Sequence, residues 1–100
     1  MASSKQFKDF ILEQTKSLGL VSKPMMGEYL LYYNGILFGG IYDDRLLIKK
    51  TNSNESYFLN EAIPYENAKP MYLVENLDDT SYLNELIKST CWDLNQRRKL

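Results

Sequence analysis

Residues 24–50, PMMGEYLLYYNGILFGGIYDDRLLIKK, carry the strongest structural signal in the chain. Asn34-Gly35 lies between two apolar runs, and this pair is typical of a type I′ hairpin turn, which needs a positive φ at both central residues. Asp43-Asp44 is a weaker signal of the same kind, because Asp tolerates left-handed backbone better than most residues. The stretch therefore predicts a meander of three antiparallel strands: 29–33, 36–42 and 45–50.

A helix is predicted before the meander, over residues 4–18. Its apolar side chains recur at helical spacing and are Phe7, Phe10, Ile11 and Leu18. Ser3 and Gln6 form the pattern of a capping box, and Gly19 stands where a left-handed C-terminal cap belongs. The helix is therefore expected to begin and end at sequence-encoded caps.

A second long helix is predicted after the meander, from Thr80 to about Asn95, capped by Asp78 or Asp79. One apolar stripe runs along it: Leu83, Leu86, Ile87, Thr90, Cys91 and Leu94. The other expected elements are a short helical turn and three short strands, at 55–60, 21–25, 62–65 and 70–75. The fold class is α+β, as one domain over residues 1–100 with a frayed basic tail at 96–100.

Counting outward from the two turns assigns each strand residue to a face of the sheet. The expected pairs are Tyr33 with Ile36, Leu31 with Phe38, Tyr29 with Gly40, Gly40 with Leu47, and Phe38 with Lys49. The face expected to pack on the helices holds Leu30, Tyr32, Leu37, Gly39, Ile41, Leu46 and Ile48. The opposite face is aromatic with a cationic edge.

Composition excludes several function classes. The chain has 100 residues, with 12 Lys and Arg against 13 Asp and Glu, so it lacks the basic excess of a dedicated duplex-binding domain. Histidine, the commonest general acid–base group and metal ligand, is absent. A single cysteine, Cys91, allows neither an intrachain disulfide nor a Cys-based zinc site. We therefore expect no catalytic residue, no metal and no cofactor.

A cytoplasmic protein is the natural interpretation of the same sequence. The N-terminus carries charges within its apolar pattern and lacks the apolar core of a signal peptide. The longest uncharged run, from Tyr29 to Tyr42, is interrupted by Gly and Asn and does not fit a membrane span.

Three other features are better explained by structure than by chemistry. Gly39-Gly40 lies inside a strand without a phosphate-loop pattern, which favours close packing or a bulge. The carboxylate pairs at 43–44 and 78–79 lie at a turn and a helix start, where Asp is expected for backbone reasons. Cys91 lies on the apolar stripe of its helix and is expected to be a buried, inert thiol.

The aromatic face of the meander is the candidate interaction surface. Its members are Tyr29, Leu31, Tyr33, Phe38, Tyr42, Arg45 and Lys49. Aromatic and cationic side chains on a sheet are the ingredients of a single-stranded nucleic-acid platform, but a packed layer or a protein interface explains the same residues, and a protein-contact surface is favoured because exposed aromatic patches usually mark protein interfaces. Because this apolar area is too large to leave exposed, the last helix or a second subunit must cover it, and we expect a symmetric homodimer.

The order and spacing of five short motifs resemble the N-terminal domain of the TfoX/Sxy family of bacterial competence regulators. The motifs are Pro24-Met25-Met26-Gly27, Tyr33-Asn34-Gly35, Phe38-Gly39-Gly40, Leu47-Ile48-Lys49 and Lys69-Pro70-Met71-Tyr72. The resemblance spans nearly the whole chain. It implies a compact α+β domain similar in shape to type III secretion chaperones.

The resemblance also implies a regulatory role, because full-length members assist a cyclic-AMP receptor-type activator at competence promoters. Those proteins carry a second, helical domain that this sequence does not contain. We therefore expect a non-enzymatic regulatory or protein-interaction module with a protein partner, such as a transcription activator. The alternatives are a small-molecule binder or unrecognised enzyme and, less favoured, a single-stranded nucleic-acid binder.

Overall fold

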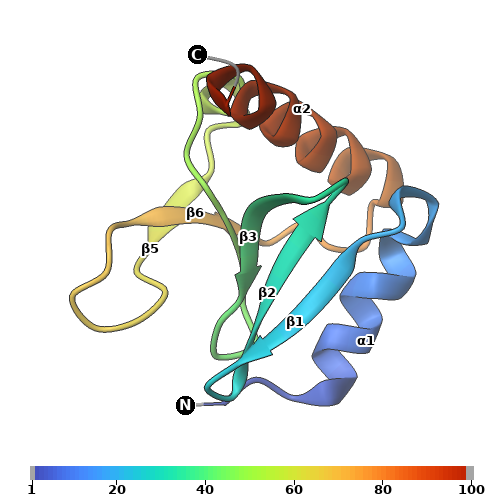
Figure 1. The fold of residues 1–100 in the computed structure, drawn as a ribbon, viewed down its shortest axis with the longest axis vertical. Coiled ribbons are helices and arrows are strands. Elements are labelled where there is room, and N and C mark those ends of the chain that lie inside the picture. Colours follow the sequence, from blue (N-terminus) through green and yellow to red (C-terminus); the bar gives the residue numbers. More distant parts are fainter. Residues whose placement is uncertain (1, 99–100) are drawn as a thin grey trace.

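The computed structural model describes residues 2–98, without the side chain of Arg98. The helices are α1 (Lys5–Gln14) and α2 (Thr80–Arg98), with short 3₁₀ turns at Lys16–Leu18 and Glu55–Tyr57. The strands are β1 (Val21–Met25), β2 (Glu28–Tyr33), β3 (Ile36–Ile41), β4 (Leu46–Ile48), β5 (Asn60–Ala62) and β6 (Met71–Val74). They form one antiparallel sheet in the order β1-β2-β3-β4-β6-β5, which confirms the predicted α+β class with a helix before and after the sheet (Figure 1).

Three tight turns with paired positive φ angles join the first four strands. Both predicted turns are present, with φ of 50° and 78° at Asn34-Gly35 and 54° at each residue of Asp43-Asp44. A third turn at Met26-Gly27, which was not predicted, joins β1 to β2 with φ of 52° and 84°. Met rarely adopts a positive φ, so Gly27 was the one residue of the pair that indicated a turn.

A β-bulge in β3 changes the predicted register between β2 and β3. Tyr33 pairs with Ile36 as expected, but Leu31 pairs with Gly39 instead of Phe38, and Tyr29 pairs with Ile41 instead of Gly40. Phe38 is thus an extra residue, and it shares its position opposite Leu31 with Gly39. The β3–β4 register remains as predicted, with Gly40 opposite Leu47.

The bulge exchanges the two predicted faces over half of the meander. The core against the helices contains Leu31 and Phe38, whereas Leu30 and Leu37 lie outside it, contrary to the expectation. Beyond the bulge the prediction is correct, because Ile41, Leu46 and Ile48 are fully buried in the core. The inserted residue reverses the alternation of side chains, and this is the physical reason for the error.

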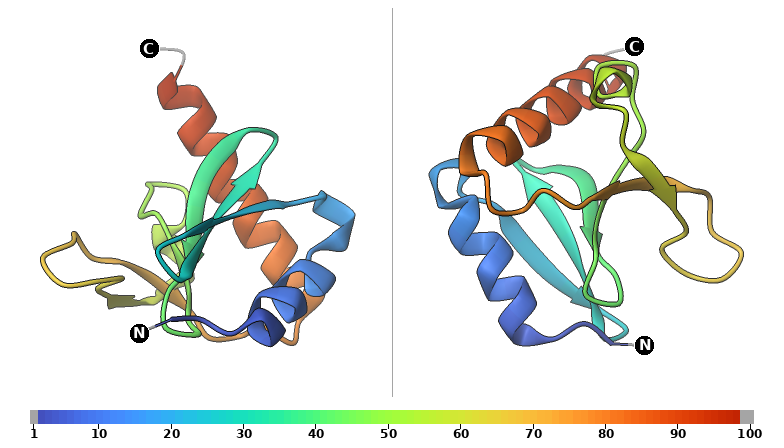
Figure 2. Two further views of the ribbon diagram at one scale, coloured as in Figure 1. Left: turned by 60° about the horizontal axis from the view of Figure 1, so that its bottom comes forward. Right: turned by 180° about the vertical axis from the view of Figure 1, so that it is seen from behind.

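Both helices pack on the same face of the sheet (Figure 2). Ile11 of α1 and the predicted stripe of α2, from Leu83 to Cys91, join the sheet residues in one core. The predicted C-terminal cap at Gly19 is confirmed by its φ of 63°. Asp79 caps α2 by accepting a 3.0 Å hydrogen bond from the Tyr82 backbone N–H.

The N-terminal cap of α1 is Ser4 and not Ser3. The Ser4 hydroxyl accepts a 3.1 Å hydrogen bond from the Phe7 N–H. Ser3 is engaged elsewhere, since its hydroxyl donates to Glu28 at 2.6 Å. The helix also ends earlier than predicted, at Gln14, and the chain continues as a 3₁₀ turn to Gly19.

Three further boundaries differ from the prediction. β5 ends at Ala62 and not at 65, because Pro64 offers no N–H for a ladder and Ala68 bonds back to Tyr65 in a turn. Phe58, in the short helical turn predicted at 55–60, is 91% exposed. Residues 96–98 continue α2, so the expected frayed tail is helical there; residues 99–100 lie outside the described part.

The bulge predicts a stability difference between two glycines. A Cβ on Gly39 would lie 2.2 Å from the Leu47 carbonyl oxygen, whereas one on Gly35 would meet nothing within 4 Å. Gly39→Ala is therefore expected to lower the free energy of unfolding by about 2–3 kcal/mol. Gly35→Ala should lower it by about 1 kcal/mol, the cost of left-handed backbone alone.

Urea denaturation of both variants, followed by circular dichroism, measures the difference. Equal destabilisation by the two substitutions would contradict the claim that contact with the β4 backbone requires glycine at position 39.

Candidate functional site

The seven residues predicted as one interaction face do not share a surface. Four of them pack on the helix-covered core: Tyr29, Leu31, Tyr33 and Phe38. Leu31 and Phe38 are 0% exposed. The other three belong to the opposite side of the sheet, namely Tyr42, Arg45 and Lys49. The bulge causes this division, because it turns Phe38 inward while Lys49 keeps its predicted orientation.

The correction removes the argument for a homodimer and for a nucleic-acid platform. Both rested on an aromatic layer left exposed by a single chain. In the structure the last helix, α2, covers that layer together with α1, so the alternative of covering by the last helix is correct and α1 adds to it. The face that carries no helix is the other one, which contains Leu30 and Leu37.

A groove lies on this open face of the sheet. It measures about 840 Å³ and is lined by strand residues, by the β5–β6 loop (63–70) and by Arg97 of α2. Leu30, Leu37 and Met71 are its half-buried apolar members. We call this hollow the basic groove.

An aromatic pair forms part of the groove wall. The rings of Tyr42 and Tyr65 lie 6.0 Å apart and are tilted by 51°. Tyr42 is 6% exposed, and burial, with smaller contributions from Tyr65 and Glu28, raises its pKa. Tyr65 is 59% exposed, so it offers an accessible aromatic surface beside a neutral, buried phenol.

Every charged residue that lines the basic groove is a cation: Lys49, Lys50, Lys69 and Arg97. Lys50 is paired with Glu61 at 2.8 Å, and Arg97 lies 3.7 Å from Asp93. Lys49 and Lys69 have no ion-pair partner among residues 2–98. The groove is therefore locally positive in a chain whose net charge is −1.

The hollow continues toward the β2–β3 turn. A smaller depression of about 370 Å³ shares Leu37, Lys49 and Arg97 with the groove and extends to Gly35 and Leu94. The open face thus presents one elongated depression with cations along it.

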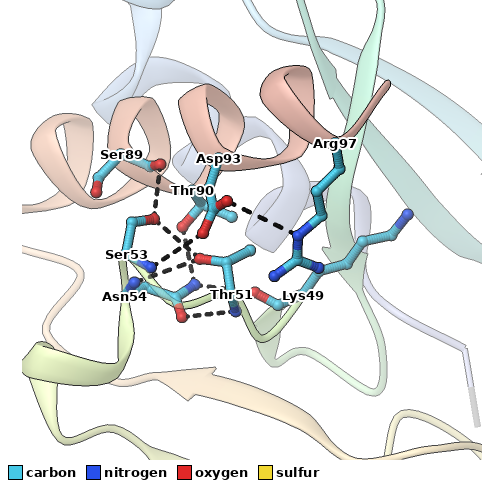
Figure 3. Close-up of polar contacts among 8 residues, drawn as sticks. All are labelled: Lys49, Thr51, Ser53, Asn54, Ser89, Thr90, Asp93 and Arg97. Atoms are coloured by element: carbon cyan, nitrogen blue, oxygen red, sulfur yellow. Dashed lines mark hydrogen bonds and ion pairs between the residues drawn. The ribbon is translucent and has the colours of Figure 1, made fainter. Parts of the chain in front are cut away.

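A cluster of polar side chains lies next to Lys49 and Arg97, two of the residues that line the groove (Figure 3). Asn54, 0% exposed, accepts from the Thr51 N–H at 2.9 Å and donates to the Lys49 carbonyl at 2.9 Å and the Thr90 hydroxyl at 3.0 Å. These bonds tie the segment after β4 to α2.

Ser53 makes the second link between that segment and α2. Its hydroxyl donates to the Ser89 carbonyl at 2.9 Å, and its N–H donates to Asp93 at 3.1 Å. Asp93 in turn lies beside Arg97. The cluster therefore fixes the backbone from which Lys49 extends and the carboxylate beside Arg97. The sequence did not predict it, because its members come from two segments far apart in the chain.

Two of the four carboxylates considered as candidates, Asp44 and Asp79, accept hydrogen bonds from backbone N–H groups. Asp44 accepts from the Ser4 N–H at 2.7 Å, and Glu28 accepts from the Asp43 N–H at 3.1 Å. Asp79 caps α2, as described above. Across residues 2–98 no group of three or more His, Cys, Asp or Glu side chains is placed to hold a metal ion.

Cys91 is 2% exposed, as predicted from its position on the stripe. Burial raises the pKa of its thiol to about 12. No helix within the described part of the chain combines the length and apolarity needed to cross a membrane.

Comparison with known proteins agrees with this architecture of an antiparallel sheet and two flanking helices. The TfoX N-terminal domain model matches residues 13–91, and the chain therefore belongs to the TfoX N-terminal domain family. The chain is also similar to an uncharacterized 12.7 kDa protein in the trpE 5′ region of Spirochaeta aurantia. The two are 28% identical over an alignment of 94 positions, and the alignment covers 90% of this chain and 82% of that protein.

The polar cluster predicts that Asn54 is a stability determinant. Asn54→Ala would leave the buried Thr51 N–H and the Lys49 carbonyl without partners, so the free energy of unfolding should fall by roughly 2–4 kcal/mol. Asn52 lies in the same segment but is exposed, so Asn52→Ala should change the free energy of unfolding by less than about 0.5 kcal/mol. Chemical denaturation of both variants tests this, and a similar loss in both would refute the role of Asn54.

The raised pKa of Cys91 predicts that its thiol reacts slowly with alkylating reagents. At pH 8 a pKa of about 12 leaves roughly a thousandth of the thiolate that the ordinary value of 9.0 would give. Alkylation by iodoacetamide, followed by mass spectrometry, should therefore be about a thousandfold slower in the folded protein than in urea. Labelling of the native protein at the rate of the unfolded chain would contradict this.

Proposed function

We propose that this chain is a non-enzymatic regulatory or protein-interaction module and that the basic groove is its binding surface. The observation that carries the proposal is the groove itself, an accessible depression with apolar members and only cationic charges. Accessible apolar area next to an aromatic side chain is typical of protein-binding surfaces.

Membership of the TfoX N-terminal domain family supports a regulatory setting for this module. A transcription activator is then the first class of partner to examine. The proposal places the protein in the cytoplasm, where a lone cysteine such as Cys91 stays reduced.

A small-molecule binder is the second candidate. The groove volume of about 840 Å³ lies within the usual range of ligand sites, about 300–1,000 Å³. A thermal-shift screen against metabolites and nucleotides examines this candidate, because a ligand that binds only the folded state raises the melting temperature.

Affinity capture from extracts of the native host tests the interaction role with a matched pair of variants. Lys49→Glu/Lys69→Glu reverses two groove charges that have no ion pair among the described residues. Lys5→Glu/Lys16→Glu makes the same change of net charge on the α1 side, where both lysines are over 75% exposed.

We expect the wild-type protein and the α1-side variant to retain the same partner and the groove variant to lose it. If all three proteins retain the same partner, the partner binds a surface other than the groove. If none retains a partner and a metabolite raises the melting temperature, the second candidate replaces the first.

A further inference from the structure

Two of the groove lysines, Lys49 and Lys69, form no ion pair among the described residues, in contrast to the lysines on the α1 side. Lys5 and Lys16 lie 3.2 Å from Asp9 and Glu13, which are four and three residues away on the same segment. Lys49 and Lys69 come from different segments and have no such acid within the described residues. Two neighbouring cations without acids favour a negatively charged occupant, since like charges placed in one site repel.

The groove also offers apolar contact between these charges. Leu30, Leu37 and Met71 are only half buried, although they lie side by side with the cations in one depression. Tyr65 stands 59% exposed at its wall, and Tyr is enriched among residues that dominate binding energy. An occupant that matches this surface carries apolar side chains as well as negative charge.

We propose that the basic groove binds an acidic, amphipathic peptide segment of a partner protein, with apolar side chains on Leu30 and Leu37 and carboxylates at Lys49 and Lys69. This inference rests on the proposed interaction role. The inference adds to that role the chemistry of the segment that the partner presents.

The length of the depression favours a peptide over a small anion. The cations come from three segments, namely the end of β4, the β5–β6 loop and the last turns of α2. The depression continues past Leu37 and Arg97 to Gly35 at the β2–β3 turn. A small carboxylate would reach one part of this path, whereas an extended segment places charges along all of it.

Charge argues against nucleic acid as the occupant. Sequence-independent binding to phosphates needs several neutralising cations, and this chain has a net charge of −1 with two of its four groove cations already beside acids. A second copy would have to bring its own apolar acidic segment to the groove.

Fluorescence anisotropy with synthetic peptides of about twelve residues tests the proposal. The probe is a labelled peptide of alternating Glu and Leu pairs. Its matched controls replace every Glu by Lys or every Leu by Ser. Laurate and oligo-dT serve as competitors for a small amphiphilic carboxylate and for single-stranded nucleic acid. Sedimentation of the protein alone reports self-association.

We expect the Glu–Leu peptide to bind at micromolar concentration, both controls to bind about tenfold or more weakly, and binding to weaken with added salt. Lys49→Glu/Lys69→Glu should lower the affinity about tenfold or more, while Lys5→Glu/Lys16→Glu leaves it unchanged. Tyr65→Ala should weaken binding, and its melting temperature is measured alongside because the ring also packs on Tyr42.

The proposal is overturned if the Glu–Leu peptide binds no better than the Lys–Leu peptide, or equally well to the groove variant. It is also overturned if laurate or oligo-dT binds the groove more tightly than the peptide, or if a dimer dissociates on the Lys49→Glu/Lys69→Glu change. If the peptide fails but capture of a partner still depends on the groove lysines, the peptide chemistry is wrong and the interaction role stands. If capture fails too, both are wrong.

Discussion

The β-bulge at Phe38-Gly39 is the constraint on which the two faces of this domain depend. By placing two residues of β3 opposite Leu31, it turns Ile36, Phe38 and Ile41 to the same side of the sheet, which regular alternation would forbid. The helices then have a continuous apolar surface to cover. The β4 backbone passes so close to Gly39 that a side chain there has no room. The bulge, the glycine and the single core are thus one structural feature.

The same feature determines which side chains remain for function. The face without a helix keeps Leu30 and Leu37, and the chain that leaves β4 brings Lys49 beside them. The polar cluster around Asn54 anchors that chain to α2 and so brings Arg97 to the same depression. Buried hydrogen bonds with all partners satisfied are rigid, so the cations are presented on a fixed backbone.

The charges of the groove are a local property that the whole-chain composition conceals. Acids and bases nearly cancel over the sequence, and Lys5, Lys16 and Lys88 each lie beside a carboxylate three or four residues away. Only where strands, loop and helix meet do cations gather without acids among the lining residues. A groove with only cationic charges therefore exists in a slightly acidic protein.

The sequence by itself determined the features that depend on neighbouring residues. The turns at Asn34-Gly35 and Asp43-Asp44, the cap at Gly19, the stripe of α2 and the family motifs were all predicted, because backbone angles and helical spacing are local properties. The sequence indicated close packing or a bulge at Gly39-Gly40, but only the tertiary structure, in which β4 packs against Gly39, decided that Phe38 is the extra residue and that the faces exchange there. The groove was decided in the same way, because its lining comes from segments far apart in sequence, and one inserted residue in β3 was enough to exchange the faces that alternation predicts.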